Sequence, residues 1–197
     1  RERVVFVGFR ADLGIEWSFP EATHSLEALL WEQVRTGDYW ERHEIAKRDR
    51  VLDPRFRARG MALLEKPADK PWLTVRDAIG DLPDPELQPE LAAACLNHRF
   101  QGGARSYVGH TGSPLDEPAK TLKAGVHGVP GGENMLRRAD GSVRYFSVRE
   151  SARLQTFPDK YRFHGSWTES MRQLGNAVPV KLAQAVGENV ARHLTAA

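Results

Sequence analysis

The first ten residues, RERVVFVGFR, constrain the fold of this chain more than any other stretch. The apolar run in residues 4–9 predicts a strand buried on both faces, as strands are inside a parallel sheet. Such a strand needs a neighbour on each side, and no obvious set of sheet strands follows in the sequence. Because position 1 is also not a Met, we expect the chain to be processed or to be a piece of something larger.

The length of 197 residues, with 41% hydrophobic residues, suits one domain or one and a half with a real core. No apolar run approaches the roughly 18 residues of a membrane span, and the start RERVVFVGFR lacks the longer apolar region and the cleavage site of a secretory signal. We therefore expect no membrane partner and a cytoplasmic location. A single cysteine, Cys95, excludes an internal disulfide, and without a cysteine cluster the seven histidines predict no metal site.

The charges nearly balance, with 28 Lys and Arg against 26 Asp and Glu, so binding to a polyanion would depend on where they lie. Residues 47–59 carry two acids and six cations, which are Lys47, Arg48, Arg50, Arg55, Arg57 and Arg59. Residues 81–90 are acidic and proline-rich, with Asp81, Asp84, Glu86 and Glu90. Each run is ordinarily a solvated face, and the cations form a phosphate-binding surface only if the fold brings them together.

Three helices are predicted in the first half of the chain. Residues 25–36 place leucines on one face and end at Gly37, a common C-terminal stop. Thr74 is a candidate N-cap with Asp77 three residues further on, and another helix should follow Pro89. That last helix is expected to bury Leu91, Cys95 and Leu96.

Glycine is concentrated in residues 102–141, which hold nine of the 17 glycines. The segment is either a flexible linker or a set of loops carried on small strands, and we favour the second interpretation. Residues 119–125, AKTLKAG, are strand-like. Residues 135–146, MLRRADGSVRYF, predict a hairpin with a two-residue turn at Asp140 and Gly141.

The stretch FSVRESARLQTFPDKY, residues 146–161, predicts a short helix. Ser147 and Glu150 have the spacing of a capping box, and Phe-Pro ends the helix. Arg149 and Arg153 share one face, and Glu150 can pair with Arg153 at the three-residue spacing. The plainer interpretation is an exposed helix with surface salt bridges.

Four stretches together resemble the DNA (cytosine-5)-methyltransferases. SVRESARLQTFPDKY resembles motif IX of that family, and RQLGNAVPVKLAQAVGENV resembles motif X. RERVVFVGFR is similar to the second half of motif VIII, and PAKTLKAGVHG to the late part of the target recognition domain. The resemblance spans the chain, strongly over residues 118–194 and thinly over residues 12–97.

The resemblance implies an α/β fold: the carboxy-terminal part of a Rossmann-like methyltransferase fold plus a small, loop-rich α+β target recognition domain. Residues 1–22 would then end the catalytic domain. Residues 23–165 would form the target recognition domain with motif IX, and residues 166–197 would return to the catalytic domain through motif X.

The resemblance also implies covalent chemistry. A cysteine thiolate adds to carbon 6 of a flipped cytosine, and carbon 5 then takes the methyl group of S-adenosylmethionine. In the family, the Pro-Cys nucleophile, the Glu-Asn-Val motif and the Gly-rich cofactor loop precede motif VIII, and none of them occurs here at such a place. The letters ENV at residues 188–190 lie inside the stretch that resembles motif X, and Cys95 follows Ala94 rather than a proline. We therefore expect an incomplete S-adenosylmethionine site, inactivity alone, and a missing amino-terminal catalytic half or subunit as partner.

Individual roles follow from the motifs. Arg3 would approach the carbonyl of the flipped cytosine, and Arg1 would support it or hold a phosphate, although both could be frayed terminal residues. Asn176 and Ala177 match positions that close over the amino-acid end of the cofactor. Backbone N–H groups at the start of the helix after Pro179 suit a carboxylate, and the alternative is an ordinary helix stop.

Double-stranded DNA is the expected partner of the glycine-rich loops. The candidate contacts are Gly102, Gly103, Arg105, Thr121, Leu122, Lys123 and His127. Arg149, Glu150 and Arg153 are expected to be structural, with the two arginines bracing these loops through buried or semi-buried pairing.

Four other functions remain open from the sequence. The chain could be a stand-alone DNA-binding module, the non-catalytic subunit of a split methyltransferase, a divergent nuclease, or a relative that methylates RNA. The isolated Pro-Asp pairs argue little for a nuclease, since they are common in turns. The glycine-rich insert favours DNA over RNA.

Overall fold

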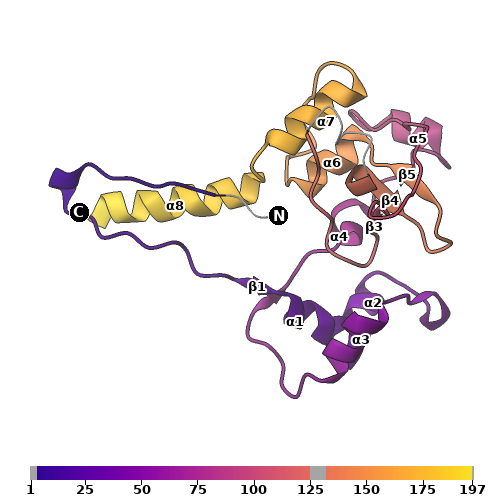
Figure 1. Ribbon diagram of the computed structural model, residues 1–197, viewed down its shortest axis with the longest axis horizontal. Helices are drawn as coiled ribbons and strands as arrows, with labels where there is room; N and C mark the ends of the chain where they lie inside the picture. The colour runs from indigo at the N-terminus through magenta and orange to yellow at the C-terminus, as the bar shows by residue number, and fades with distance from the viewer. Residues whose placement is uncertain (1–3, 125–131, 197) are drawn as a thin grey trace.

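The computed structural model describes residues 4–124 and 132–196, which form three parts (Figure 1). A helical unit comprises residues 24–71, and a central unit comprises residues 74–176. An arm, made of residues 4–23 and the last helix, projects from the rest of the molecule. The predicted mixed α/β class is confirmed by the small sheets and the helices that surround them.

The helical unit packs short helices around a small core of Leu29, Tyr39 and Trp40. The Ser25 side chain caps its first helix, and Gly37 ends that helical stretch with a φ of 87°, as predicted. The unit contains β1 (His24–Ser25), α1 (Leu26–Leu30), the π-helix η2 (Trp31–Thr36), α2 (Asp38–Arg42), the 3₁₀-helix η3 (Lys47–Asp49), α3 (Pro54–Met61) and β2 (Lys70–Pro71), with β1 and β2 paired in parallel.

The central unit builds its core from helices against a three-stranded sheet. Strand β4 lies in the middle, parallel to β3 and antiparallel to β5. Its elements are α4 (Val75–Ile79), α5 (Pro89–Ala93), β3 (Ser113–Pro114), the 3₁₀-helix η4 (Gly132–Asn134), β4 (Met135–Arg137), β5 (Val143–Tyr145), α6 (Val148–Leu154) and α7 (Trp167–Asn176). The core includes Val75, Ile79, Leu122, Leu136, Phe146, Ala152, Met171 and Leu174.

Local capping signals in this unit are confirmed, whereas one burial prediction is wrong. Thr74 and Asp77 form a complete capping box at the start of α4, and α5 begins at Pro89. Leu91, however, is 61% exposed, and its neighbour Ala92 is buried instead. The short helix α5 turns its small residue, not its leucine, towards the core.

The hairpin forms, but with a different turn. The N–H of Arg138 donates to Ser142, and the N–H of Gly141 donates to Arg138, which closes a three-residue loop. Only Gly141 has a positive φ, 85°, so Asp140 does not adopt the predicted two-residue turn geometry. Residues 119–124 also do not form the predicted strand, since their backbone is held by side chains such as Asn134 and Ser113.

Asp116 connects the two units. Its carboxylate accepts hydrogen bonds from the Tyr39 hydroxyl at 2.8 Å and from Arg76 at 2.6 and 3.0 Å. Its carbonyl accepts one from the Gln33 side chain at 2.7 Å. These buried and half-buried contacts fix the helical unit to the segment that leads out of β3.

The arm pairs residues 4–23, including the 3₁₀-helix η1 (Ala11–Leu13), with α8 (Val180–Ala196). Trp17 donates to the side chain of Asn189 at 2.5 Å. The predicted strand at residues 4–9 is absent, because no described segment lies beside it as a hydrogen-bonding partner. No helix in the described part of the chain is long and apolar enough to cross a membrane.

The sequence predicts domain boundaries after residues 22 and 165. The helical unit begins near the first boundary. Helix α7 follows the second boundary, yet Met171 and Leu174 of α7 lie in the core of the central unit. The chain leaves that core only after Asn176.

Candidate functional site

The first turn of α6 is fixed by the capping box that the sequence predicts. The Ser147 hydroxyl accepts a hydrogen bond from the N–H of Glu150, and the Glu150 carboxylate accepts one from the N–H of Ser147 at 2.8 Å. The buried imidazole of His98 lies 2.7 Å from the Ser147 hydroxyl and 2.7 Å from the carbonyl of Pro83. The cap is therefore tied to the chain on both sides of α5.

Glu150 pairs with Arg144 and not with Arg153, so that predicted pair is wrong. Two guanidinium nitrogens of Arg144 donate to the two carboxylate oxygens at 2.7 and 2.8 Å, and the two residues are 3% and 1% exposed. Arg144 reaches Glu150 because β5 leads directly into α6. A bidentate pair of this kind is strong and directional, and it fixes the hairpin to the helix.

The acidic stretch at residues 81–90 binds arginines and is not simply a solvated face. Asp84 accepts hydrogen bonds from Arg144 at 3.2 Å and from Arg138 at 3.1 Å, and Arg138 also pairs with Glu86 at 2.7 Å. Burial alone would raise the pKa of Asp84. The backbone N–H of Glu86 and the two guanidinium groups outweigh burial and hold that pKa below its ordinary value.

Arg149 is 1% exposed and binds backbone carbonyls from two distant segments. It donates to Leu96 at 2.8 Å, to Tyr161 at 2.8 Å and to Pro158 at 3.3 Å. The Asp159 carboxylate lies 3.7 Å away. Burial lowers the pKa of Arg149. The planar guanidinium suits this arrangement, because its donors point in several fixed directions.

Arg153 lies one turn further along α6 and is more exposed. It donates to Asp159 at 2.7 and 2.8 Å, contacts the Asp81 carboxylate, and reaches the carbonyl of Ala78 at 3.4 Å. The hydrogen bond with Asp159 raises the pKa of Arg153. These contacts are of the kind that the predicted bracing role requires, and the role itself stays a prediction.

The candidate DNA contacts lie on two segments without regular structure. Gly102, Gly103 and Arg105 are exposed, and Gly103 has a φ of 90°, which favours glycine. The segment then turns back through a bridge between Tyr107 and His110.

The second segment, residues 121–124, has one buried anchor. Leu122 lies in the core at 4% exposure, so its side chain holds the segment, while Thr121 is exposed. The backbone of Lys123 exchanges hydrogen bonds with the Asn134 side chain, and its ammonium group lies 3.1 Å from Glu133. Three of the predicted site residues, His127, Arg1 and Arg3, lie outside the described residues.

Asn176 and Ala177 lie where α7 ends. The side chain of Asn176 is exposed. The N–H of Ala177 donates to the carbonyl of Gln173 at 3.0 Å, and Ala177 itself has an extended conformation. The exposed amide of Asn176 can donate and accept hydrogen bonds, which suits the charged amino-acid end of a cofactor. These residues fit one edge of such a site.

Gln155 and Thr156 hold the loop between α7 and α8. The buried Gln155 side chain donates to the carbonyl of Leu174 at 2.9 Å, and the backbone carbonyl of Gln155 accepts from the N–H of Val180 at 3.0 Å. The Thr156 hydroxyl accepts from the N–H of Lys181 at 2.9 Å. The N–H groups of Val180 and Lys181 at the start of α8 therefore already have partners within the chain. The expectation that the first N–H groups of this helix bind a carboxylate is wrong for these two groups.

Gly175 brings the two candidate regions into contact. A Cβ atom at this position would lie 2.6 Å from the Cβ and the backbone nitrogen of Ala124 and 2.7 Å from its Cα. The end of α7 therefore packs directly on the backbone of residues 121–124. The segment expected to bind DNA and the loop expected to bind the cofactor share this contact.

We expect Gly175→Ala to cost about 1–3 kcal/mol, because backbone atoms on both sides must separate. Gly187→Ala is the matched control. Gly187 lies in α8 with nothing within 4 Å of the added Cβ, so there alanine should stabilise the helix by up to about 1 kcal/mol. Urea unfolding of both variants measures the difference. Equal changes in the two variants would contradict this close packing.

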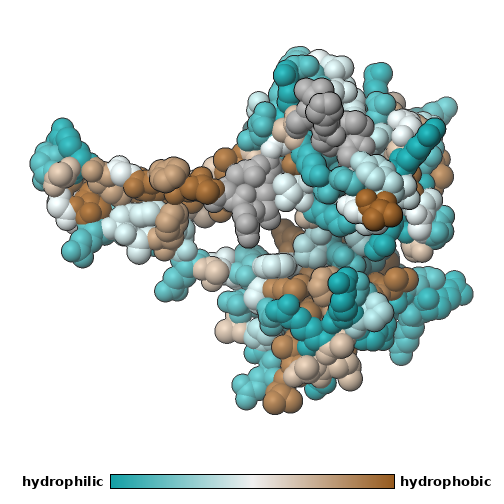
Figure 2. Space-filling model, viewed as in Figure 1, coloured by the Kyte–Doolittle hydropathy of each residue, from teal (hydrophilic) through white to brown (hydrophobic). Residues whose placement is uncertain are grey.

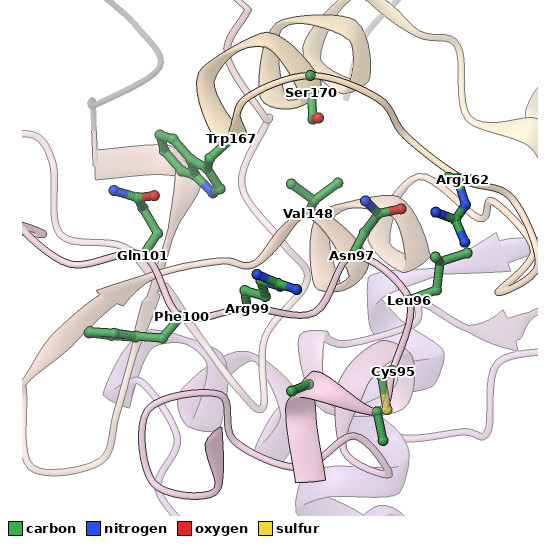
Figure 3. Close-up of a pocket in the computed structure, with 13 residues that line it drawn as sticks. Cys95, Leu96, Asn97, Arg99, Phe100, Gln101, Val148, Arg162, Trp167 and Ser170 are labelled. Atoms are coloured by element: carbon green, nitrogen blue, oxygen red, sulfur yellow. The ribbon is translucent and has the colours of Figure 1, made fainter. Parts of the chain in front are cut away.

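A cavity of about 650 Å³ opens between α7 and the segment after α5 (Figure 3). Gln101 and Trp167 lie on one side of this view, and Arg162 lies on the other, beside Leu96. Arg99 also lines the cavity. None of these polar residues is predicted as a site residue from the sequence, although Arg99 and Gln101 lie within three residues of Gly102. No sequence signal predicts that Arg162 joins them.

Cys95 also lines this cavity. Its sulfur lies 3.9 Å from the carbonyl of Leu91, one helical turn earlier. Among the described residues, no group of three or more metal-ligating side chains lies together.

Comparisons with known proteins give consistent matches. A family model described as C-5 cytosine-specific DNA methylase matches residues 1–192. The chain is 30% identical to Type II methyltransferase M.Eco47II of Escherichia coli, over 96% of this chain and 41% of the relative. It is 32% identical to Type II methyltransferase M.NgoFVII of Neisseria gonorrhoeae, over 94% and 45%. It is 36% identical to Type II methyltransferase M.PspPI of Psychrobacter sp., over 64% and 36%. The chain thus spans less than half the length of these relatives.

Proposed function

Because the chain belongs to the C-5 cytosine-specific DNA methylase family, we propose that it is the DNA-recognition and partial cofactor-site portion of a DNA (cytosine-5)-methyltransferase. The complete enzyme would transfer a methyl group from S-adenosylmethionine to carbon 5 of a flipped cytosine. This chain would be inactive alone, since it lacks a Pro-Cys nucleophile.

The observation that carries the proposal is the apolar surface of the arm. Val4 is 81% exposed and Phe6 is 93% exposed, while Leu182 and Leu194 on α8 are 39% and 49% exposed. Figure 2 shows apolar residues along the arm, away from the two packed units. Contiguous exposed apolar surface of this kind marks an interaction site. We infer that the catalytic half of the enzyme, on polypeptide outside this chain, covers the arm.

The roles of individual residues follow within this proposal. Arg3 would approach the carbonyl of the flipped cytosine, and Arg1 would support it or hold a phosphate. Asn176 and Ala177 would contact the amino-acid end of S-adenosylmethionine, which supplies the methyl group when bound.

Duplex DNA would lie against the segments around residues 102–105 and 121–124. Gly103 lets the backbone approach the partner closely, and Arg105 and Lys123 supply donors to phosphate or to base edges. Both segments belong to the central unit, whose core would hold them in place.

Asn176→Ala tests the cofactor role. In the enzyme reassembled with its catalytic half, we expect the affinity for S-adenosylmethionine to fall about tenfold, the value of one lost hydrogen bond to a charged group. Calorimetry measures this affinity without relying on turnover. The chain itself should melt unchanged, because the side chain is exposed. Gln173→Ala on the exposed face of α7 is the control, and an unchanged affinity in Asn176→Ala would remove this residue from the site.

A non-catalytic DNA-binding function is the alternative, either as a subunit of a split methyltransferase or as a stand-alone module. The exposed and irregular segment around Arg105 supports DNA binding in both cases. Titration of a labelled duplex with the chain alone distinguishes them. Tight binding without a partner would favour the module. Weak binding that strengthens when the catalytic half is added would favour a chain that works with that half, as the proposed portion and a split subunit both do.

A further inference from the structure

Some cations of the helical unit form ion pairs and others do not. Most arginines there pair with nearby carboxylates: Arg42 with Glu32 at 3.0 Å, Arg48 with Asp49 at 3.6 Å, Arg55 with Asp53 at 3.0 Å, and Arg59 with Glu27. Lys47, Arg50 and Arg57 form no ion pair with any described residue. Their positive charge is therefore available to an outside partner.

These three cations line one cavity. Its volume is about 430 Å³, and its other walls are made by uncharged residues that include Gln33, Trp40 and Met61. No carboxylate lies among the described residues of the lining. Three like charges around one space repel each other, and an anion bound between them removes that cost.

The cavity is held by packed elements. Trp40 donates to the carbonyl of Gln33 at 2.7 Å, which fixes two of its walls together. Arg50, which lines the cavity, donates to the carbonyl of Ile45 at 3.1 Å, and this bond restricts its guanidinium. Gly60 brings α3 against the π-helix, since a Cβ there would lie 2.7 Å from Val34. These contacts preorganise the cationic walls for a ligand.

We propose that this cavity binds a phosphate group of the DNA backbone, outside the contacts made by the recognition segments. Two guanidinium groups can each present paired donors to phosphate oxygens, and the lysine adds a point charge. The presence of an anion site follows from the cavity alone. Its assignment to DNA rests on the proposed function.

The test compares two double variants with the same loss of charge. Lys47→Gln with Arg57→Gln removes two cavity cations, and Arg48→Gln with Lys66→Gln removes two exposed cations outside the cavity. All four side chains are exposed, so both variants should melt like the wild type. Binding of a fluorescent duplex by the full chain is then measured over a series of salt concentrations.

We expect the cavity variant to bind the duplex about tenfold more weakly, and its salt slope to fall by about one, as for one lost phosphate contact. The control should keep both values near those of the wild type. Equal losses in the two variants would show a general charge effect and overturn the proposal, as would unchanged binding by the cavity variant.

A second arm separates DNA from free phosphate. Inorganic phosphate should raise the melting temperature of the wild type more than that of the cavity variant, whether or not the proposed function is correct. If the wild type binds no duplex while phosphate still stabilises it, DNA is excluded as the ligand. If phosphate stabilises both proteins equally, the anion site itself is excluded.

Discussion

Glu150→Gln is expected to destabilise the fold by about 3 kcal/mol, the loss typical when one partner of a buried ion pair is removed. For a chain of this size, such a loss lowers Tm by about 6–12 °C. The guanidinium of Arg144 is 3% exposed and would keep only Asp84 as a charged partner. Glutamine can still complete the capping box with Ser147, so the substitution isolates the charge.

Glu169→Gln is the control for this experiment. Glu169 is also the third residue of a helix capped by a serine, at the start of α7. Its ion pair with Arg172 is on the surface, with about half of each side chain exposed, so its loss should cost at most about 0.5 kcal/mol. Urea unfolding gives both values. Equal losses of unfolding free energy in the two variants would show that the buried Arg144–Glu150 pair stabilises the fold no more than a surface pair.

Arg149→Lys is expected to cost about 2–4 kcal/mol. The guanidinium bridges carbonyls of Leu96, Pro158 and Tyr161, and a lysine ammonium is too compact to reach all of them. At least one buried carbonyl then loses its donor, and the buried charge is less well solvated. The segments beside α6 should loosen, and duplex binding should weaken with them.

Arg153→Lys is the matched substitution one turn away. Its side chain is 18% exposed, and its partners Asp81 and Asp159 are largely exposed, so the loss should stay below about 1 kcal/mol. Thermal melting and duplex titration are measured for both variants. An unaltered melting curve together with unaltered binding in Arg149→Lys would rule out its bracing role.

Features set by a few neighbouring residues could be predicted from the sequence. The capping boxes at Thr74 and Ser147 and the helix stop at Gly37 depend on hydrogen bonds within one turn. The sequence pattern predicts the hairpin correctly, but the predicted two-residue turn is wrong. In the three-residue loop only Gly141 has a positive φ, so Asp140 avoids this unfavourable conformation.

Features that depend on distant segments could not be predicted. Spacing along α6 suggested Arg153 as the partner of Glu150, yet the buried partner comes from β5 and is reinforced by Asp84 from beyond α4. The close packing of Gly175 on Ala124 likewise leaves no local signal. The apolar run at residues 4–9 did signal a strand, but a strand forms only where neighbouring strands exist to bond it.

The candidate site shows the same division. The exposed position of Asn176 at the end of α7 follows from a local helix stop, which the sequence contains. The cationic cavity of the helical unit could not be predicted from the sequence. Lys47 and Arg57 come from different helices, η3 and α3, which meet only in the folded unit.

In the proposed enzyme, this chain supplies part of a methyl-transfer site whose remaining walls lie on other polypeptide. The most direct measurement is transfer of labelled methyl groups from S-adenosylmethionine to cytosine in duplex DNA. It compares this chain alone, a catalytic half that carries the Pro-Cys and Gly-rich motifs, and the two mixed. We predict product only in the mixture. Product formed by this chain alone would show that the chain holds a complete site and would rule out the proposed function.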